Sequence, residues 1–389
     1  MSGGKWRISA AIATACVAMA TFTACGSGDD SSSAGGSGGG ENKEARTTGE
    51  ALKVGGQKGP NGEVATPITD IKVTDEDVAK IKAGKFTAAI VWHEFGTDLP
   101  RAMTAGMRKR FGELGIKIVA ITSAEFDAAK QNNDIESVLG RKPSVIMSIP
   151  VDAESSASAF RQALDRGTKI VFLGNPPKKF VHGKDYIAVM ASDEAMLGNW
   201  AAKILGDSMG GKGKVGMVFY DADFYVTNQR DQAFREAMKR DYPGIEIVAE
   251  SGFHDPKRVE AVAGALITRY PDIKGIYTTW AEPAEQVLAA LRQAGRKDIK
   301  VSTIDLSQPL ALDMAHKGQT LGMSANRIFD LGVAAANAAG LGLIGKPGPE
   351  YAITSSIAVT RDNLLEAWKT SYGTEAPKAV RDAMAAEGS

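Results

Sequence analysis

The sequence predicts an α/β protein made of two similar lobes, each a mainly parallel sheet flanked by helices. The chain has 389 residues, which is more than one ordinary domain holds. From Phe86 onward, short apolar runs alternate with segments whose apolar residues recur at helical spacing. The runs are apolar throughout, which is typical of parallel strands that are covered on both faces.

The apolar runs predict nine strands, at 87–92, 117–121, 145–149, 169–173, 214–220, 245–249, 275–278, 300–304 and 320–323. Helical spacing between them predicts helices that include 128–139, 155–165, 199–208, 261–270 and 283–294. Residues 49–84 are rich in polar and turn residues and hold one short candidate helix at 75–82. We therefore expect a loosely ordered arm ahead of the two lobes.

Two stretches of the chain are similar to each other, which favours two related lobes. Residues 144–174 and 275–305 each read as a strand, a helix containing Arg-Gln-Ala, a glycine, and a second strand that begins with lysine. The alternative is a chance similarity between two ordinary strand–helix–strand units.

Composition excludes several classes of function. Lys plus Arg and Asp plus Glu both number 46, so the neutral chain has no electrostatic hold on nucleic acid or on a phospholipid surface. The 2 cysteines exclude a disulfide framework. The 4 histidines are dispersed, and no two have the i, i+4 spacing of a helical zinc site. We expect neither a metal nor a cofactor.

The segment GLGLIGK at 340–346 matches a glycine-rich phosphate pattern only superficially. Such motifs follow a strand and open a helix, whereas the Ala-rich residues 331–339 before this one have helical spacing. We interpret the glycines as the end of a helix. The sequence also has no nucleophile-elbow motif around a serine, and neither cysteine would be available as a catalytic nucleophile once the N-terminal segment described below has been processed. It therefore predicts a binding protein and not an enzyme.

The first 24 residues are typical of an export signal. Lys5 and Arg7 give a positive start, and residues 8–22 are apolar or small and carry no charge. This stretch is shorter than the roughly 20 residues that a membrane-spanning helix needs. We assign 1–24 to a signal peptide.

Cys25 resembles the lipidated cysteine of bacterial lipoproteins, although Phe22 stands where leucine is usual. Behind it, 12 of the 15 residues at 26–40 are Gly or Ser, the composition of a flexible tether. An anchored protein needs a tether, so we expect lipid on Cys25 and attachment to the outer face of the cell membrane through this anchor only. Tether and arm would span 25–85. The alternative is an ordinary secretory signal with a disordered mature terminus.

Polar and aromatic residues follow most of the predicted strands, and this predicts a ligand site, since ligands of open α/β sheets bind beyond the carboxyl ends of the strands. The candidates are Trp92, His93, Glu94, Phe95, Asp98, Asn175, Asp223, Asn228, Arg230, His254, Trp280, Asp305 and Asn326. Carboxylate, amide and guanidinium groups together suit hydroxyls, which both donate and accept hydrogen bonds. The C–H faces of a sugar pack on aromatic rings. Trp92 and Trp280 end strands in different lobes, so the mixture favours a small neutral sugar or polyol; the alternative for each tryptophan is a place in the core.

Several segments carry a resemblance to a known family: TAAIVWHEFG, VIMSIPVDAESSASAFRQA, the Ser192-Asp193 pair, GKVGMVFYDADF with NQRDQAF, and VSTID. Together they resemble type 1 periplasmic binding proteins of the ribose-binding kind, the substrate-binding components of bacterial sugar ABC transporters. The resemblance runs from about Phe86 to about Trp368. It implies the periplasmic-binding-protein-like I fold, with two lobes joined by a three-strand hinge and the ligand between them. It also implies an ABC permease and its ATPase as partners, and we expect a monomer.

On this basis we assign 86–191 with 326–347 to an N-terminal lobe and 192–325 with 348–372 to a C-terminal lobe, followed by a tail at 373–389. Two departures stand out: Gly174-Asn175 where ribose-type members carry Asp-Arg, and Trp280-Ala281 where they carry Asn-Asp. The pocket loses charged groups and gains a ring, so we expect another aldose, a deoxysugar or a polyol in place of ribose. The alternative is a receptor of the same fold for another small solute, such as an autoinducer, a nucleoside or an amino acid, acting in uptake or sensing.

Overall fold

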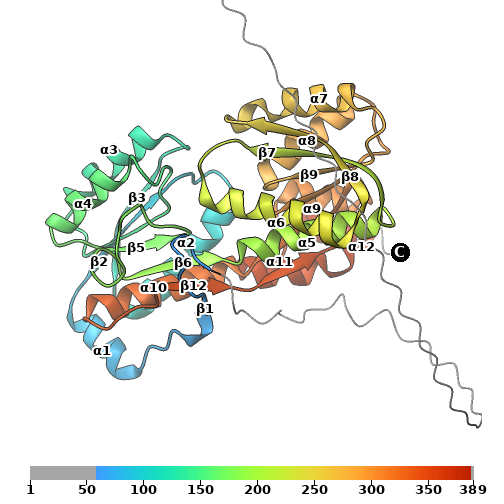
Figure 1. The fold of residues 1–389 in the computed structure, drawn as a ribbon. Coiled ribbons are helices and arrows are strands. Elements are labelled where there is room, and N and C mark those ends of the chain that lie inside the picture. The colour runs from blue at the N-terminus through green and yellow to red at the C-terminus, as the bar shows by residue number, and fades with distance from the viewer. Residues whose placement is uncertain (1–57, 387–389) are drawn as a thin grey trace, which may run out of the picture. The chain divides into compact units, whose positions relative to one another are not determined.

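The computed structural model describes residues 58–386; the expected signal peptide, Cys25 and the Gly/Ser tether lie outside this range. The described chain forms two sheets of mainly parallel strands, each with helices on both faces (Figure 1). The predicted α/β architecture with two lobes is confirmed. We call the first sheet and its helices the first lobe, and the second sheet and its helices the second lobe.

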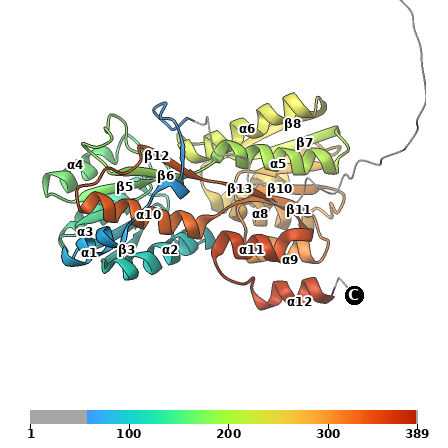
Figure 2. The ribbon, with the colours of Figure 1, turned by 90° about the horizontal axis from the view of Figure 1, so that it is seen from below.

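The first sheet has seven strands, and every neighbouring pair is parallel. In spatial order they are β1 (Thr66–Pro67), β12 (Tyr351–Thr354), β6 (Ala188–Ser192), β5 (Lys169–Leu173), β4 (Val145–Ser148), β2 (Thr87–Trp92) and β3 (Lys117–Ser123). One face is covered by α1 (Asp75–Ala83), α2 (Asp98–Leu114) and α10 (Ile328–Leu343) (Figure 2). The other face is covered by α3 (Ala128–Leu139) and α4 (Ala157–Asp165).

The second sheet has six strands, parallel except for the antiparallel edge pair of β11 and β13. In spatial order they are β13 (Ser356–Val359), β11 (Thr320–Asn326), β10 (Lys300–Ile304), β9 (Gly275–Thr278), β7 (Lys212–Tyr220) and β8 (Gly244–Phe253). One face packs against α5 (Glu194–Ser208) and α6 (Tyr225–Asp241). The other packs against α7 (Val259–Arg269), α8 (Ala281–Gln293), α9 (Gln308–Ala315) and α11 (Leu364–Tyr372), and α12 (Lys378–Ala386) lies against α9. Short 3-10 turns lie at Ile68–Asp70, Pro256–Arg258 and Arg361–Asn363.

Side-chain alternation explains why strands such as β2 are continuously apolar. Along β2, Ile90 and Trp92 belong to the core shared with α2 and α10, whereas Ala89 and Val91 belong to the core shared with α3 and α4. Successive side chains of a strand point to opposite faces, so a sheet with helices on both faces favours apolar residues at most strand positions.

The chain passes between the sheets three times: from β6 to α5, from β11 to α10, and from β12 to β13. The three-strand hinge implied by the family resemblance is therefore present. The assignment of 348–372 to the C-terminal lobe is wrong in part, because β12 pairs with β6 in the first sheet and only β13 joins the second. These two short strands are separated by a single residue, and no local pattern marks where the chain changes sheets.

The segment at 58–85 is not a loosely ordered arm. Thr66 pairs with Ala352, which places β1 at the edge of the first sheet. α1 begins with a capping box in which Thr74 and Asp77 bond each other's backbone N–H, and Ile81 is fully buried. The tail at 373–389 likewise contains α12, whose Val380 and Ala383 are buried.

Candidate functional site

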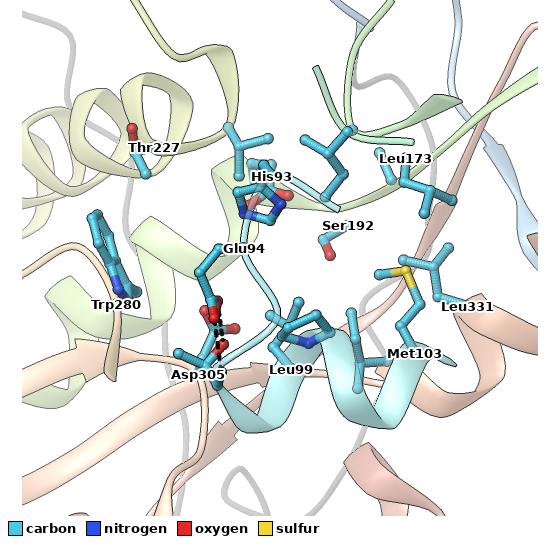
Figure 3. Close-up of a pocket in the computed structure, with 18 of the residues that line it drawn as sticks. His93, Glu94, Leu99, Met103, Leu173, Ser192, Thr227, Trp280, Asp305 and Leu331 are labelled. Carbon is cyan, nitrogen blue, oxygen red and sulfur yellow. Dashed lines mark hydrogen bonds between the residues drawn. The ribbon is translucent and has the colours of Figure 1, made fainter. Parts of the chain in front are cut away.

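A cleft lies at the carboxyl ends of the strands of both lobes (Figure 3). It holds about 730 Å³ free of protein atoms, a measure that includes space open to solvent. Five of the residues predicted from strand ends line this cleft: His93, Glu94, Arg230, Trp280 and Asp305.

The first lobe contributes the turn between β2 and α2. Glu94 accepts hydrogen bonds from the Thr97 N–H and from Thr97 Oγ1, both at 2.9 Å, so its carboxylate is fixed against the start of α2. A negative group at that point is favourable, because the N–H groups of a first helical turn are unpaired. Burial raises the pKa of Glu94, despite the hydrogen bonds from Thr97.

His93 stacks on Phe224, which comes from the second lobe, with 5.9 Å between the ring centroids and 23° between the planes. Burial, and secondarily the charge of Arg230, lowers the pKa of His93 to about 4. The imidazole is therefore neutral at physiological pH. It lines the cleft as an uncharged ring.

The second lobe contributes a buried ionic network. Arg230 donates from Nε to Glu194 Oε2 at 2.5 Å and from Nη1 to Asp305 Oδ2 at 3.0 Å. These three residues come from α6, from the first turn of α5 and from the residue after β10, and the fold brings them together. Burial raises the pKa of Glu194 and of Asp305, and the charge of Arg230 acts against that rise.

Backbone strain marks two positions of the lining. Asp305 has φ 68° and Phe126 has φ 62°, both in the left-handed region that non-glycine residues rarely occupy. Such strain persists where the surrounding structure imposes it, and it clusters at functional sites. At Asp305 the turn aims the carboxylate at Arg230 and into the cleft.

Trp280 brings an aromatic ring to the cleft. Its ring lies 6.0 Å from Phe126 in a stacked arrangement, 5.6 Å from Tyr220 and 5.4 Å from Phe253. Phe126 comes from the first lobe and the other rings from the second. Rings from both lobes therefore meet beside the cleft.

Trp92 does not line the cleft, although the sequence favours it as a stacking ring. Its side chain is fully buried, and Nε1 donates to Thr104 Oγ1 of α2 at 3.0 Å. The alternation along β2 turns it toward the core under α2. Phe95 stacks on Trp92 with 6.4 Å between centroids and likewise lies outside the lining.

The remaining strand-end candidates also lie outside the lining. Asp98 opens α2, and Asp223 is exposed with Lys178 at 3.6 Å. Asn228 is exposed and donates to the Ala222 carbonyl, and His254 is exposed near Asp221.

Asn175 and Asn326 are buried at the ends of their segments but do not line the cleft. A strand end places a residue at the right edge of the sheet, and the turn after it decides where the side chain points.

Sequence reasoning missed most of the apolar lining. It comprises Leu99, Pro100, Met103, Phe126, Ile149, Leu173, Met190, Ala191, Val226, Ile328 and Leu331. Thr97, Gly174, Ser192, Glu194, Phe224 and Thr227 complete the lining. Ile149 and Leu173 are the last residues of predicted strands, so their position was a usable signal. Met190 lies in β6, which the sequence did not predict.

Residues 58–386 contain no group of three or more His, Cys, Asp or Glu side chains placed to hold a metal ion. Among the helices of that same part of the chain, none is long and apolar enough to cross a membrane. The side chains that line the cleft offer hydrogen bonding, ring packing and apolar contact.

Comparison with known proteins agrees with this geometry. A family model described as a periplasmic binding protein domain matches residues 89–347. A ribose import binding protein of Salmonella typhimurium is 22% identical over 221 residues, which are 57% of this chain and 73% of that protein. A xylitol-binding protein of Mycolicibacterium smegmatis is 22% identical over 247 residues, which are 62% of this chain and 68% of that protein.

Among solved structures, an ABC transporter solute binding protein from Agrobacterium vitis, bound with α-D-tagatopyranose, superposes with a TM-score of 0.69 at 21% identity. The match covers 75% of this chain and 100% of that one, and it shows a shared fold. Proteins of this family bind substrates for transporters and are not enzymes, and the family implies an extracytoplasmic location. Because the family model spans more than half of the sequence and the two-lobed fold agrees with it, this chain belongs to the type 1 periplasmic binding proteins.

Proposed function

We propose that this protein is the lipid-anchored solute receptor of an ABC importer, and that it captures a sugar or polyol in the cleft between its lobes. The observation that carries the proposal is the network of Arg230, Glu194 and Asp305 beside Trp280 in that cleft. Carboxylate oxygens accept hydrogen bonds from hydroxyls, and the indole ring packs against C–H groups. The ribose- and xylitol-binding relatives support the same class of ligand.

A thermal-shift screen against sugars and polyols, followed by calorimetric titration of each hit, tests the ligand class. A ligand at 100 times its Kd stabilises the folded protein by about 2.7 kcal/mol, which raises the melting temperature of a body of this size by several degrees. The proposal predicts a saturable hit with no chemical change in the recovered ligand. Stabilisation by nucleosides or amino acids, and by no sugar or polyol, would replace it with the alternative solute class.

The anchor is tested separately at Cys25. The Gly/Ser segment behind this cysteine supports a lipid tether, and delivery to a permease and its ATPase takes place at the membrane. Cys25→Ser is expected to move the protein from the washed membrane fraction to the soluble exported fraction, as a monomer with an unchanged melting temperature. Retention of the variant on salt-washed membranes would rule out anchoring through this residue.

A further inference from the structure

We propose that the ligand has two chemically different ends: a hydroxylated head that faces Arg230, Asp305 and Trp280, and a short apolar arm that lies against the opposite side of the cleft. This inference rests on the proposed function and narrows its ligand class to sugars or polyols that carry a deoxy, alkyl or thioalkyl substituent.

The apolar side is continuous and comes entirely from the first lobe. It is formed by Leu99, Pro100, Met103, Leu173, Met190 and Leu331. Leu173 and Met190 belong to β5 and β6 of the first sheet, and the other four residues belong to α2 and α10, which pack on one face of that sheet. Figure 3 shows Met103, Leu173 and Leu331 together on one side, and Trp280 with Thr227 on the other.

This side has few groups for hydroxyls to bond. Each sugar hydroxyl both donates and accepts hydrogen bonds, so a hydroxyl buried against Leu, Met and Pro side chains loses its water partners without replacement. A bare sugar that filled the cleft would suffer this loss at several hydroxyls. A methyl, alkyl or thioether group loses nothing there and gains from leaving water.

The opposite side requires donors. Glu194 and Asp305 are two buried carboxylates that share the single guanidinium of Arg230. Arg230 already directs Nε and Nη1 at those carboxylates, so it is not a free anchor for an anionic ligand. Glu94 adds a third carboxylate to the lining. Hydroxyl donors satisfy these oxygens, whereas a carboxylate or phosphate on the ligand would be repelled.

Matched pairs of compounds test the apolar arm by calorimetric titration of the full chain. The pairs are D-galactose with 6-deoxy-D-galactose, D-ribose with its 5-deoxy-5-methylthio derivative, and D-glucose with butyl β-D-glucoside. Each buried methylene is worth about fourfold in affinity. We expect the apolar member of at least one pair to bind at least tenfold more tightly than its partner.

A substitution in the apolar side of the cleft tests whether that side causes the preference for the apolar compound. Leu99 lines the cleft and is half-buried, so Leu99→Asn is expected to remove the preference for the apolar member of each pair. Leu365→Asn is the matched control, because Leu365 is also half-buried but lies on α11, outside the lining. It should keep the full preference.

The outcomes separate the two proposals. If plain sugars bind as tightly as or more tightly than their apolar partners, the apolar arm is wrong and the receptor function stands. If Leu99→Asn still prefers the apolar member of a pair, the apolar side of the cleft does not cause the preference and the inference is overturned. If no member of any pair binds at millimolar concentration while a nucleoside or amino acid does, the sugar or polyol function fails, and the arm falls with it.

Discussion

Asp305 combines a left-handed backbone, near-complete burial and an ion pair at 3.0 Å with Arg230. An aspartate is among the few non-glycine residues that adopt this backbone region readily, because its short polar side chain bonds locally. The strained turn lets the carboxylate face Arg230 and the cleft at once. Under the proposed function, Asp305 is the preset acceptor for a ligand hydroxyl.

Asp305→Asn is expected to lower ligand affinity about tenfold or more. Asparagine tolerates the left-handed backbone, so the change removes the charge with little distortion, and hydrogen bonds to charged groups contribute about 1.5–3 kcal/mol. Calorimetric titration with the ligand from the screen measures the loss. Asp223→Asn is the control, since Asp223 is exposed and outside the lining; equal losses in both variants would contradict the assignment.

The two strand-end tryptophans should behave differently. Trp280 is part of the lining, whereas Trp92 is buried against Thr104. Ligand addition is expected to change tryptophan fluorescence in the wild type and in Trp92→Phe, and the change should disappear in Trp280→Phe. Trp92→Phe should instead lower the melting temperature, since it removes a buried hydrogen bond. A ligand response that survives in Trp280→Phe would place the reporting ring elsewhere.

Asp231 should make stability depend on pH. It is buried and accepts a hydrogen bond from the Tyr277 hydroxyl at 2.8 Å, and burial raises its pKa to about 6. A carboxyl group whose pKa is higher in the folded than in the unfolded protein stabilises the fold at pH values below its unfolded pKa, which is near 4. This stabilisation is lost as the pH rises through about 6. The full shift corresponds to about 3 kcal/mol.

Urea denaturation at pH 5 and pH 7.5 checks this. On going from pH 7.5 to pH 5, the free energy of unfolding of the wild type should rise by about 1 kcal/mol more than that of Asp231→Asn. At pH 7.5, Asp231→Asn should be the more stable of the two proteins. Parallel pH profiles for the two proteins would show that Asp231 titrates normally in the fold.

At the scale of elements, α2 and α10 touch backbone to backbone beneath the cleft. A Cβ on Gly332 would lie 2.1 Å from the Met103 carbonyl oxygen, and one on Gly106 would lie 2.1 Å from the Phe329 carbonyl oxygen. Both helices also line the cleft, through Met103 and Leu331. The spacing between α2 and α10 therefore sets the position of the apolar side of the cleft.

Gly332→Ala should separate the two helices, lower the free energy of unfolding by about 1–3 kcal/mol and weaken ligand binding, because overpacking displaces backbone. Gly112→Ala is the control in α2, where a Cβ meets nothing within 4 Å. That change should stabilise the protein by up to about 1 kcal/mol through helix propensity. The urea midpoints of the two variants should shift in opposite directions from the wild-type midpoint. A shift of both midpoints in the same direction would refute the close contact between the helices.

At the scale of the whole molecule, three short crossovers connect the lobes, and a few side-chain contacts bridge them across the cleft. Phe126 stacks on Trp280, His93 stacks on Phe224, and the Tyr225 hydroxyl donates to the Lys58 carbonyl at 3.3 Å. Hinge closure around a ligand is a common motion of such two-lobed binding proteins. Bridging rings that also touch the ligand would hold the closed form more firmly.

The radius of gyration from small-angle scattering is therefore expected to fall when the ligand saturates the protein. Asp305→Asn at the same ligand concentration serves as the control, because it should remain largely unbound and keep its ligand-free profile. An unchanged profile in a wild-type sample shown by calorimetry to be saturated would exclude closure as the binding motion.

Most strands of the lobes were predictable because burial of a sheet on both faces produces short, mainly apolar runs in the local sequence. β2, β5, β9 and β10 lie at the predicted residues, since each is a short, mainly apolar run. The same pattern predicted the edge of the sheet at which ligand groups gather, and so identified Arg230, Trp280 and Asp305. β1 was not predictable, because it has only two residues and Thr66 pairs with Ala352 across a long stretch of chain. β12 was missed although it is as long as β9.

The sequence by itself thus determined the α/β class, the two lobes and the side of the sheets where the cleft lies, because these follow from local apolar patterns and strand direction. The family came from the resemblance of particular segments, and the family model confirms it. Only the tertiary structure decided which residues line the cleft. Trp92 ends a strand yet turns into the core, while Leu99, Phe126 and Leu331 reach the cleft from elements that strand ends do not mark. The physical reason is that the direction of a side chain after a strand depends on the turn and on packing partners far away in the sequence.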